Sequence, residues 1–320
     1  MAQASQNFAQ QSFAPRRSEP LFGRLAIIGI GLIGSSIAHA AKDLNLAARV
    51  VLYDRDAGVR IRARELDLGH EIAEAAADAV READHVVLCV PVGACGAVAA
   101  EIAASLKPGA ILSDVGSVKG AVVDAVSPHL PEGVHFVPAH PVAGTENSGP
   151  DAGFPSLFLN RWCILTPPEG TDEAAIARTR QLWEGMGAIV EVMTASHHDL
   201  VLAVTSHLPH LIAYNIVGTA EDLATVTQSE VIKFSAGGFR DFTRIAASDP
   251  TMWRDVFLHN KDAVLEMLGR FSEDLAVLTR AIRFGDGETL HKHFTRTRAI
   301  RRGIVALGQE KPETEKLRKD

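Results

Sequence analysis

Short apolar runs alternate with longer stretches of helical periodicity along the first two thirds of the chain. The runs have the length and composition of buried strands. They cover residues 25–31, 50–54, 85–92, 110–116, 135–141, 162–167 and 188–193. Strands that alternate with helices form parallel sheets covered by those helices. The pattern therefore predicts an α/β fold with a doubly wound parallel sheet.

The strand pattern ends near residue 195, and the remaining sequence is almost wholly helical in its periodicity. We therefore expect a sheet domain over residues 22–194, followed by an all-α domain over residues 195–308. The polar N-terminal residues 1–21 are expected to form a disordered tail, and residues 309–320 a charged tail. The expected helical ranges of the second domain are 196–222, 224–235, 250–284 and 287–307.

Composition and charge narrow the class of protein. The 320 residues are 47% hydrophobic and 22% charged, with a net charge of −7; this is typical of a globular enzyme and gives no support to a nucleic-acid partner. No apolar run approaches the length of about 18 residues that a membrane helix needs. Cys89, Cys95 and Cys163 form no CxxC or metal-ligand pattern. We therefore expect no metal, and a location in the cytoplasm, where thiols stay reduced.

A glycine-rich turn follows the first predicted strand. Residues 29–34 read GIGLIG, a G-x-G-x-x-G motif, and Asp54 follows at the end of the second predicted strand. In this setting the first glycine permits a tight turn and the second lets the backbone approach a pyrophosphate. The third glycine lets the helix pack close to the strand. The motif therefore predicts a dinucleotide-binding site.

The acidic residue at the end of the second strand favours NAD over NADP. Asp54 would hydrogen bond the adenosine ribose and repel a phosphate on it. Arg55 follows directly and could receive such a phosphate, so NADP stays open as a weaker alternative. The expected cofactor-binding residues are Gly29, Ile30, Gly31, Leu32, Ile33, Gly34, Asp54, Arg55, Val90, Pro91 and Ser117.

One histidine lies on a stiff segment of the chain. His140 is held between Pro138 and Pro141, and prolines push such a segment into an extended conformation. Its ring is either satisfied by neighbouring backbone or aimed at a substrate. Ser117 also follows a predicted strand, and the carboxyl ends of parallel strands form the ligand crevice of an open sheet. Because both residues are expected at that edge, we expect both to face the nicotinamide.

Polar residues also gather in the helical half. His207 and His210 flank Pro209, which should bend the helix that carries them. Arg244 has apolar neighbours, as expected for a guanidinium turned inward to meet a carboxylate. That carboxylate is either an acidic side chain of the protein or a group on a substrate, and the residues alone leave both interpretations open.

Five motifs along the chain occur in the order of a known family. They are GIGLIG at 29–34, DVGSVK at 114–119, HPVAGTENSG at 140–149, SHLPH at 206–210 and GGFRDFTRIAASDPTMWRD at 237–255. In these motifs the chain resembles the prephenate, arogenate and cyclohexadienyl dehydrogenases. The resemblance runs from about residue 24 to residue 284. It implies a Rossmann-type domain followed by an all-helical dimerisation domain, and hence a homodimer.

The resemblance also implies roles for particular residues. His140 would be the catalytic group, and Ser117 would orient it and touch the nicotinamide. Arg244 would hold a substrate carboxylate, and Gly237 would reach the site of the partner subunit. The expected substrate-binding residues are Arg244, His210, Trp253, Thr145, Glu146, Asp241, Gly237 and His207, with Asp199 as a nearby candidate.

The implied reaction is an oxidative decarboxylation in tyrosine biosynthesis. Prephenate or arogenate would lose a hydride to NAD and release carbon dioxide, giving 4-hydroxyphenylpyruvate or tyrosine. The two substrates differ by a keto or an amino group on the side chain, and both stay open. A 3-hydroxyacid dehydrogenase would carry a lysine on the first long interdomain helix, whereas residues 196–222 contain none. A redox sensor that has lost catalysis would show degraded catalytic motifs, and here they are intact.

Overall fold

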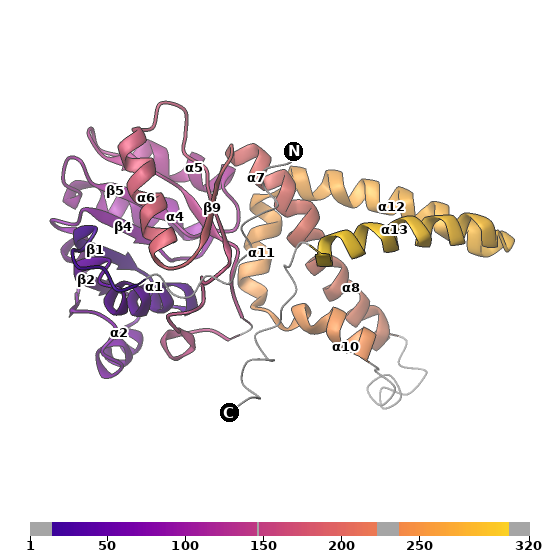
Figure 1. Ribbon diagram of the computed structural model, residues 1–320, viewed down its shortest axis with the longest axis horizontal. Helices are drawn as coiled ribbons and strands as arrows, with labels where there is room; N and C mark the ends of the chain where they lie inside the picture. Colours follow the sequence, from indigo (N-terminus) through magenta and orange to yellow (C-terminus); the bar gives the residue numbers. More distant parts are fainter. Residues whose placement is uncertain (1–14, 146, 223–236, 307–320) are drawn as a thin grey trace. The chain divides into compact units, whose positions relative to one another are not determined.

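The computed structural model describes residues 15–145, 147–222 and 237–306 (Figure 1). By their internal contacts the described residues form two compact units, and the chain passes from one to the other within helix α12 (Lys261–Phe284), between Val264 and Leu265. The first unit contains the sheet and all the functional residues considered below. The second contains the rest of α12 and helix α13 (Gly287–Ala306). The domain boundary that the strand pattern places near residue 195 stays a prediction.

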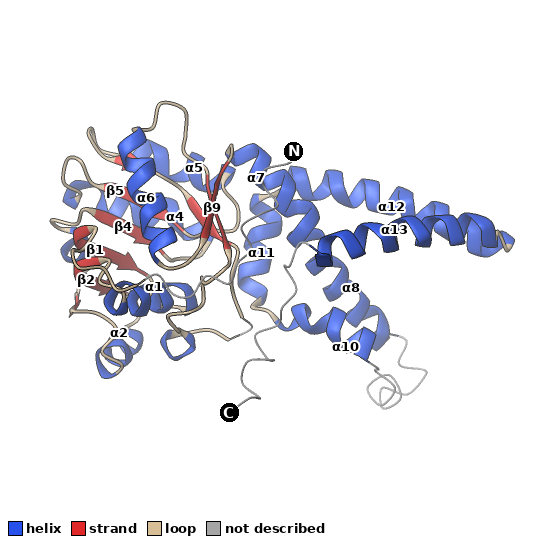
Figure 2. Ribbon diagram, in the orientation of Figure 1, coloured by secondary structure: helices blue, strands red, loops and turns tan. Residues whose placement is uncertain are grey.

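Six parallel strands form the main sheet in the order β3-β2-β1-β4-β5-β6. Figure 2 labels β1, β2, β4 and β5 of this sheet, drawn in red. The order reverses at β1, because β2 and β4 lie on its opposite sides, and open sheets of this kind bind ligands at such a switch point. The predicted doubly wound parallel sheet is confirmed, with β3 as a short strand that the apolar pattern did not indicate. The strands are β1 (Phe22–Ile28), β2 (Ala47–Tyr53), β3 (Glu71–Ile72), β4 (His85–Leu88), β5 (Ile111–Asp114) and β6 (His135–Phe136).

Helices cover both faces of this sheet. Leu25 and Ile27 of β1 face one apolar core, and Ala26 and Ile28 face the other, which is the alternation of a strand buried on both sides. The first core includes side chains of helices α1 (Leu32–Asp43), α2 (Ala57–Glu65) and α6 (Glu173–Gly185). The second includes side chains of helices α3 (Ala76–Val80), α4 (Cys95–Ile102), α5 (Gly120–Val126) and α11 (Pro250–His259).

The strand expected over residues 135–141 is divided in two, which corrects the expectation of a single sheet. β6 pairs with β5, but β7 (Ala139–Pro141) leaves the main sheet and pairs antiparallel with β8 (Trp162–Leu165). β9 (Ile189–Val192) then adds to β8 in parallel. The change of partner falls at Pro138, which has no N–H to continue a ladder and whose carbonyl instead accepts a hydrogen bond from Thr166 N at 3.0 Å.

The helix expected over residues 196–222 is interrupted near its middle. α7 (Ala195–Leu202) and α8 (Leu208–Asp222) are joined by a π-helical segment, Ala203–His207. Pro209 lacks an N–H and its ring crowds the carbonyl of Thr205, four residues earlier, so a wider turn at this point has a local cause. π-Helical segments are frequent at functional sites, and this one ends at His207.

The stretch Ala195–Asp222 is long and apolar enough to span a membrane by length and composition, with a mean hydropathy of 1.4 over its most apolar window. It nevertheless carries the buried polar residues His198, Asp199 and His207. These side chains hydrogen bond to Lys119 and His140 of the sheet domain and to Asn260, between α11 and α12. We therefore interpret the stretch Ala195–Asp222 as a helical segment that packs within the folded protein.

Several expected segments lie outside the described residues. These are residues 1–14 of the expected N-terminal tail, the charged tail at 309–320, and the helix expected over 224–235. The end of the N-terminal tail is described, and there Arg17 and Leu21 donate backbone hydrogen bonds to the carbonyls of Leu44 and Leu46. Residues 17–21 therefore lie along the turn between α1 and β2, where disorder was expected.

Candidate active site

The glycine turn between β1 and α1 has the backbone geometry that its sequence predicts. Gly29 has a positive φ of 98°, and a Cβ at this position would lie 2.4 Å from the carbonyl oxygen of Cys89. A Cβ on Gly34 would lie 2.0 Å from the carbonyl oxygen of Gly29. Neither position can therefore carry a side chain without moving backbone, as a close crossing of helix and strand requires.

The second glycine of the motif borders open space. A Cβ on Gly31 would meet no atom within 4 Å, so the backbone is accessible there. Helix α1 begins directly afterwards, with no side-chain cap and no acidic residue in its first turn. Its N-terminal N–H groups can therefore receive a pyrophosphate. These features fit a dinucleotide, with Ile30, Leu32 and Ile33 completing the turn.

Asp54 is fixed beside this turn. Its Oδ2 atom accepts a hydrogen bond from Ile30 N at 2.9 Å, and its Oδ1 atom accepts one from Asp56 N at 2.9 Å. Each carboxylate oxygen has two lone pairs, so both can also accept from ribose hydroxyls. Arg55 is exposed. Arg60, which the sequence motifs did not indicate, donates to the backbone carbonyls of Asp54 and Arg55 at 2.8 and 3.1 Å.

The ends of β4 and β5 border the same edge of the sheet. Val90 packs against the glycine turn, because a Cβ on Gly29 would lie 3.2 Å from its Cγ1 atom. Pro91 follows and is exposed, and Ser117 is partly exposed in the bend after β5. The structure thus places Val90 beside the glycine turn, as we expected for a residue at the end of a strand.

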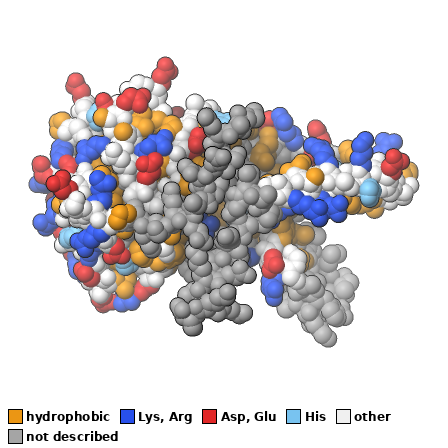
Figure 3. Space-filling model, viewed as in Figure 1, with side chains coloured by type: hydrophobic (Ala, Val, Ile, Leu, Met, Phe, Trp, Pro, Cys, Tyr) orange, Lys and Arg blue, Asp and Glu red, His pale blue; other side chains and the backbone are white. Residues whose placement is uncertain are grey.

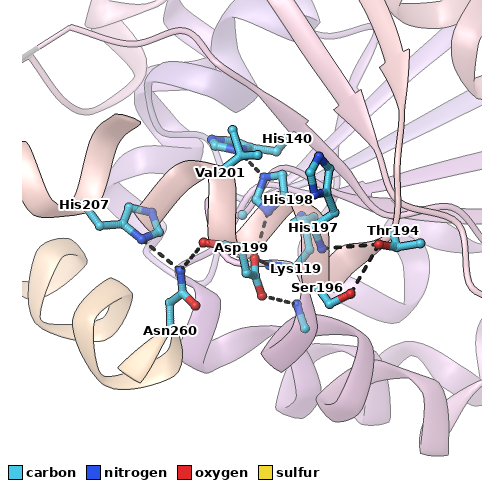
Figure 4. A network of polar contacts seen from close by, with 12 residues as sticks. Lys119, His140, Thr194, Ser196, His197, His198, Asp199, Val201, His207 and Asn260 are labelled. Atoms are coloured by element: carbon cyan, nitrogen blue, oxygen red, sulfur yellow. Dashed lines mark hydrogen bonds and ion pairs between the residues drawn. The ribbon is translucent and has the colours of Figure 1, made fainter. Parts of the chain in front are cut away.

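His140 lies in β7 and is only 8% exposed. Its Nδ1 atom lies 2.8 Å from Nε2 of His198, and Nδ1 of His198 lies 2.8 Å from Oδ1 of Asp199 (Figure 4). His198 and Asp199 belong to α7, which begins after Thr194, whose side chain accepts a hydrogen bond from His197 N. Ser117 was expected to orient His140. Among the described residues the hydrogen-bond partner of the His140 ring is His198, and the orienting role expected of Ser117 stays a prediction.

The directions of these hydrogen bonds follow from the chemistry of the partners. A carboxylate only accepts, so His198 must donate from Nδ1 to Asp199. A neutral His198 then carries its lone pair on Nε2, and His140 must donate to it from Nδ1. The remaining ring nitrogen of a neutral His140, Nε2, is left as an acceptor.

Burial keeps both imidazoles neutral. It lowers the pKa of His140 well below the ordinary value of 6.5, and the neighbouring His198, Lys119 and His207 lower it further. Burial also lowers the pKa of His198, although its hydrogen bond to Asp199 opposes the effect. An unprotonated His140 can accept a proton, so this environment suits a general base.

Asp199 joins α7 to the start of α5. Its two carboxylate oxygens accept hydrogen bonds from Lys119 N and Gly120 N, each at 2.8 Å. Burial tends to raise the pKa of Asp199, but the hydrogen bonds from His198, Lys119 and Gly120 together lower it. The carboxylate therefore stays ionised at the positive end of a helix and is a fixed acceptor for His198.

Asn260 links His207 to the backbone of Asp199. Asn260 Nδ2 donates to the backbone carbonyl of Asp199 at 2.9 Å and lies 3.1 Å from Nδ1 of His207. An amide nitrogen only donates, so a neutral His207 accepts at Nδ1 and carries its proton on Nε2. Burial lowers the pKa of His207 to about 4, and the backbone of Ser117 partly opposes this effect. The backbone at Ser117 therefore lies next to His207.

Two of the expected substrate-binding residues stack on each other. The rings of His210 and Trp253 lie 3.6 Å apart with an interplanar angle of 22°. His210 donates from Nδ1 to the carbonyl oxygen of Ser206 at 2.8 Å. Burial lowers the pKa of His210, and the positive charge of Arg244 lowers it further. Arg244 is thus near this pair. The residue is exposed, whereas its apolar neighbours in the sequence favoured an inward orientation.

The remaining expected residues lie apart from these contacts or outside the described part. Thr145 is exposed and accepts a hydrogen bond from Asn147 N at 3.3 Å. Asp241 is exposed, 3.7 Å from Arg240, and Gly237 is four residues before it at the start of α10 (Gly237–Thr243). Glu146 is outside the described residues. The roles expected of these four residues stay predictions.

Three buried residues of the site were not among those expected from the sequence. His198 precedes Asp199, Lys119 ends the DVGSVK motif, and Asn260 lies between α11 and α12. The only local signal was the polar HHD sequence at 197–199 at the start of an otherwise apolar helix.

A Rossmann-type sheet with a glycine turn, an acidic strand end and a neutral buried histidine defines a nicotinamide-dependent dehydrogenase. Residues 37–192 match the family model for the nucleotide-binding domain of prephenate dehydrogenase, and residues 194–296 match the model for its dimerisation domain. The chain belongs to the prephenate dehydrogenase family, which confirms the resemblance seen in the five motifs.

Individual relatives agree with this assignment. The chain is 47% identical over 281 residues to cyclohexadienyl dehydrogenase of Zymomonas mobilis, covering 88% of this chain and 96% of that protein. It is 34% identical over 284 residues to prephenate dehydrogenase of Bacillus subtilis, covering 88% and 76%. The crystal structure of prephenate dehydrogenase from A. aeolicus in complex with hydroxyphenyl propionate and NAD+ matches with a TM-score of 0.81 and 33% identity, covering 88% of this chain and 98% of that one.

Proposed function

We propose that the protein catalyses the oxidative decarboxylation of prephenate, arogenate or both, with NAD as hydride acceptor, in tyrosine biosynthesis. The membership of the family supports this reaction. The observation that carries it is the buried, neutral His140 at the carboxyl edge of the nucleotide-binding sheet. Its Nδ1 atom is used in the hydrogen bond to His198, and its Nε2 atom remains as an acceptor.

The chemistry of the substrate determines what the protein must supply. The ring carries a hydroxyl group and a carboxylate. When bound at the glycine turn, NAD would supply the acceptor for the hydride that leaves the ring carbon bearing the hydroxyl. His140 accepts the hydroxyl proton at Nε2 as the carbonyl forms. Loss of the ring carboxylate as carbon dioxide leaves its electron pair in the ring, which becomes aromatic, and His140 returns the proton to the phenolate oxygen.

The nucleotide end of the site serves to bind and orient. Gly29, Gly31 and Gly34 form the turn for the pyrophosphate, Asp54 would hydrogen bond the ribose, and Val90 with Pro91 would border the nicotinamide side. We propose that Ser117, whose backbone lies next to His207, contacts the nicotinamide. NADP would be a weaker alternative, with Arg55 able to meet its extra phosphate.

The substrate end is proposed around His210, Trp253 and Arg244. Arg244 would hold a substrate carboxylate by charge-assisted hydrogen bonds. Because a group that held the departing ring carboxylate equally tightly throughout would oppose its loss, we assign Arg244 to positioning. Thr145, Glu146 and Asp241 would complete the polar wall, and Gly237 would reach the site of the partner subunit.

The second compact unit is proposed to join two copies of the chain. It matches the family's dimerisation domain in part, and α12 and α13 expose many large apolar side chains, some visible as orange spheres among charged ones (Figure 3). Apolar exposure of this kind marks an interface. The exposed side chains are Leu265, Leu275, Val277, Ile282, Phe284, Phe294, Ile300 and Ile304. We expect the enzyme in the cytoplasm, where its three free cysteines would remain reduced.

One assay tests the proposed function. Purified protein is given prephenate or arogenate with NAD or NADP, and the reduced cofactor and the aromatic product are both measured. We expect product with at least one of the two substrates, and a larger kcat/KM with NAD. Reduction of cofactor by neither substrate would contradict the proposal.

A further inference from the structure

His198 connects the catalytic histidine to a fixed carboxylate. The side chain of His198 is completely buried, and the planes of the His140 and His198 rings cross at 70° with their centres 5.0 Å apart. Figure 4 shows His198 between His140 and Asp199, which belong to different elements. Nothing in the sequence motifs gave this residue a role.

A neutral imidazole can carry its proton on either ring nitrogen, and the bond made by one nitrogen decides the state of the other. An isolated neutral histidine side chain favours the proton on Nε2. In this site the reverse holds for His140, because its Nδ1 atom faces the lone pair of His198 at 2.8 Å. The proton is therefore kept on Nδ1, and Nε2 is kept available.

We propose that His198 is a positioning residue that holds His140 in the tautomer whose Nε2 atom accepts the substrate hydroxyl proton. This inference rests on the proposed function for the identity of the proton donor. Asp199 acts one step further away: it accepts from Nδ1 of His198 and so keeps Nε2 of His198 as an acceptor. When His140 takes the proton, the positive ring donates to His198, and the ionised Asp199 stabilises the charge along the same line.

The fixed end of this chain gives it the rigidity that positioning requires. Asp199 accepts hydrogen bonds from two consecutive backbone N–H groups at the start of α5, and its backbone carbonyl accepts from Asn260. A rotation of the Asp199 side chain or of α7 would break these hydrogen bonds, so they hold the carboxylate in place. The orienting carboxylate of a catalytic triad acts in the same way on its histidine.

Two amide substitutions separate the two hydrogen bonds of His198. In His198→Asn the amide lies near the place of Nδ1, so it can still donate to Asp199 but cannot reach His140. In His198→Gln the amide lies near the place of Nε2, so its oxygen can accept from His140. We expect kcat to fall about 10²- to 10⁴-fold in His198→Asn, as when a triad loses its orienting group. In His198→Gln we expect kcat to stay within about 10-fold, with KM changed less than about threefold in both.

A purely structural role predicts the opposite order. If His198 serves only to satisfy Asp199, His198→Asn should keep nearly full activity, and His198→Gln should lose melting temperature and activity together. Equal activity of the two variants, or a more active Asn variant, would overturn the proposal. The neighbouring exposed residue provides a matched control, because His197→Asn should leave kcat, KM and melting temperature unchanged.

The tautomer can also be read without any activity. Nitrogen-15 NMR of histidine-labelled protein distinguishes protonated from unprotonated ring nitrogens, and the signals of His140 are those missing in His140→Asn. We expect Nδ1 of His140 to be protonated in the unaltered protein and Nε2 to be protonated, wholly or in part, in His198→Asn.

This spectrum decides the question even if both His198 variants fail to fold. A protonated Nε2 on His140 in an active, unaltered enzyme would overturn this inference alone. The expected tautomer in a protein that oxidises neither prephenate nor arogenate would overturn the proposed function alone.

Discussion

The buried ammonium group of Lys119 lies 2.6 Å from the carbonyl oxygen of Ala139, the residue that precedes His140. The same Nζ atom lies 2.5 Å from Oδ2 of Asp114 at the end of β5, and both of these side chains are fully buried. Lys119 therefore attaches the strand that carries His140 to the end of the main sheet. Both contacts are charge-assisted, which makes them stronger than neutral hydrogen bonds.

Removing this ammonium group should destabilise the protein. We expect Lys119→Met to lower the free energy of unfolding by about 3–5 kcal/mol, because the carboxylate of Asp114 would remain buried without its cation. Urea denaturation measures the effect. The double variant Lys119→Met, Asp114→Asn removes the orphaned charge and should recover much of the loss. A single variant as stable as the unaltered protein would show that the pair makes no net contribution.

The base role proposed for His140 predicts a defect in turnover. In His140→Asn a polar side chain remains but the basic nitrogen is lost, so kcat should fall at least about 100-fold while KM changes little. Steady-state kinetics with the better substrate provide the measurement. Retention of more than about a tenth of the turnover would mean that another group takes the proton.

Asp54 should control the choice of cofactor. We expect kcat/KM to be at least about tenfold higher with NAD than with NADP, because the carboxylate binds ribose hydroxyls and repels a phosphate. Asp54→Ser should narrow this difference, with Arg55 contacting the phosphate. Equal use of both cofactors by the unaltered enzyme would show that Asp54 does not contact the ribose.

Arg244 should contribute to substrate affinity more than to turnover. Arg244→Gln keeps some hydrogen bonding but loses the charge, so KM should rise roughly 10- to 100-fold while kcat falls much less. The melting temperature of the same variant is the control. A destabilised protein with a nearly normal KM would indicate that Arg244 forms an internal ion pair.

The buried histidines predict a loss of stability in mild acid. His85 packs edge-on against Phe22, and burial lowers its pKa to about 3. Below pH 6.5 the unfolded chain binds a proton at this residue while the folded protein does not, so stability should fall from pH 6.5 towards pH 3. At pH 5 one such histidine costs about 2 kcal/mol.

A substitution of His85 tests this linkage. His85→Leu should reduce the slope of unfolding free energy against pH between 6.5 and 4, measured by urea denaturation at several pH values. His129 is exposed, and His129→Leu is the control that should keep the slope. An unchanged slope in His85→Leu would exclude His85 as a source of the acid sensitivity.

The sequence alone determined those parts of the protein that depend on local backbone requirements. The positive φ at Gly29 and the contact distance at Gly34 can be met only by glycine, so the nucleotide-binding turn could be predicted from six residues. The position of His140 on an extended segment followed from Pro138 and Pro141 for the same reason. The motifs that identify the family are also continuous stretches of sequence.

The tertiary structure decided which distant residues meet. β7 leaves the main sheet because its partner β8 offers hydrogen bonds beyond Pro138, and no local pattern specifies that partner. His140 and His198 are 58 residues apart, and Asn260 and Asp199 are 61 apart. The packing of β7 and of the end of α11 against α7 brings these pairs into contact, and burial lowers the pKa of His140. Composition and periodicity indicate only that a helix has a buried face. A hydrogen bond between two buried side chains depends on how whole elements pack, so the orientation and tautomer of His140 could be inferred only from the folded chain.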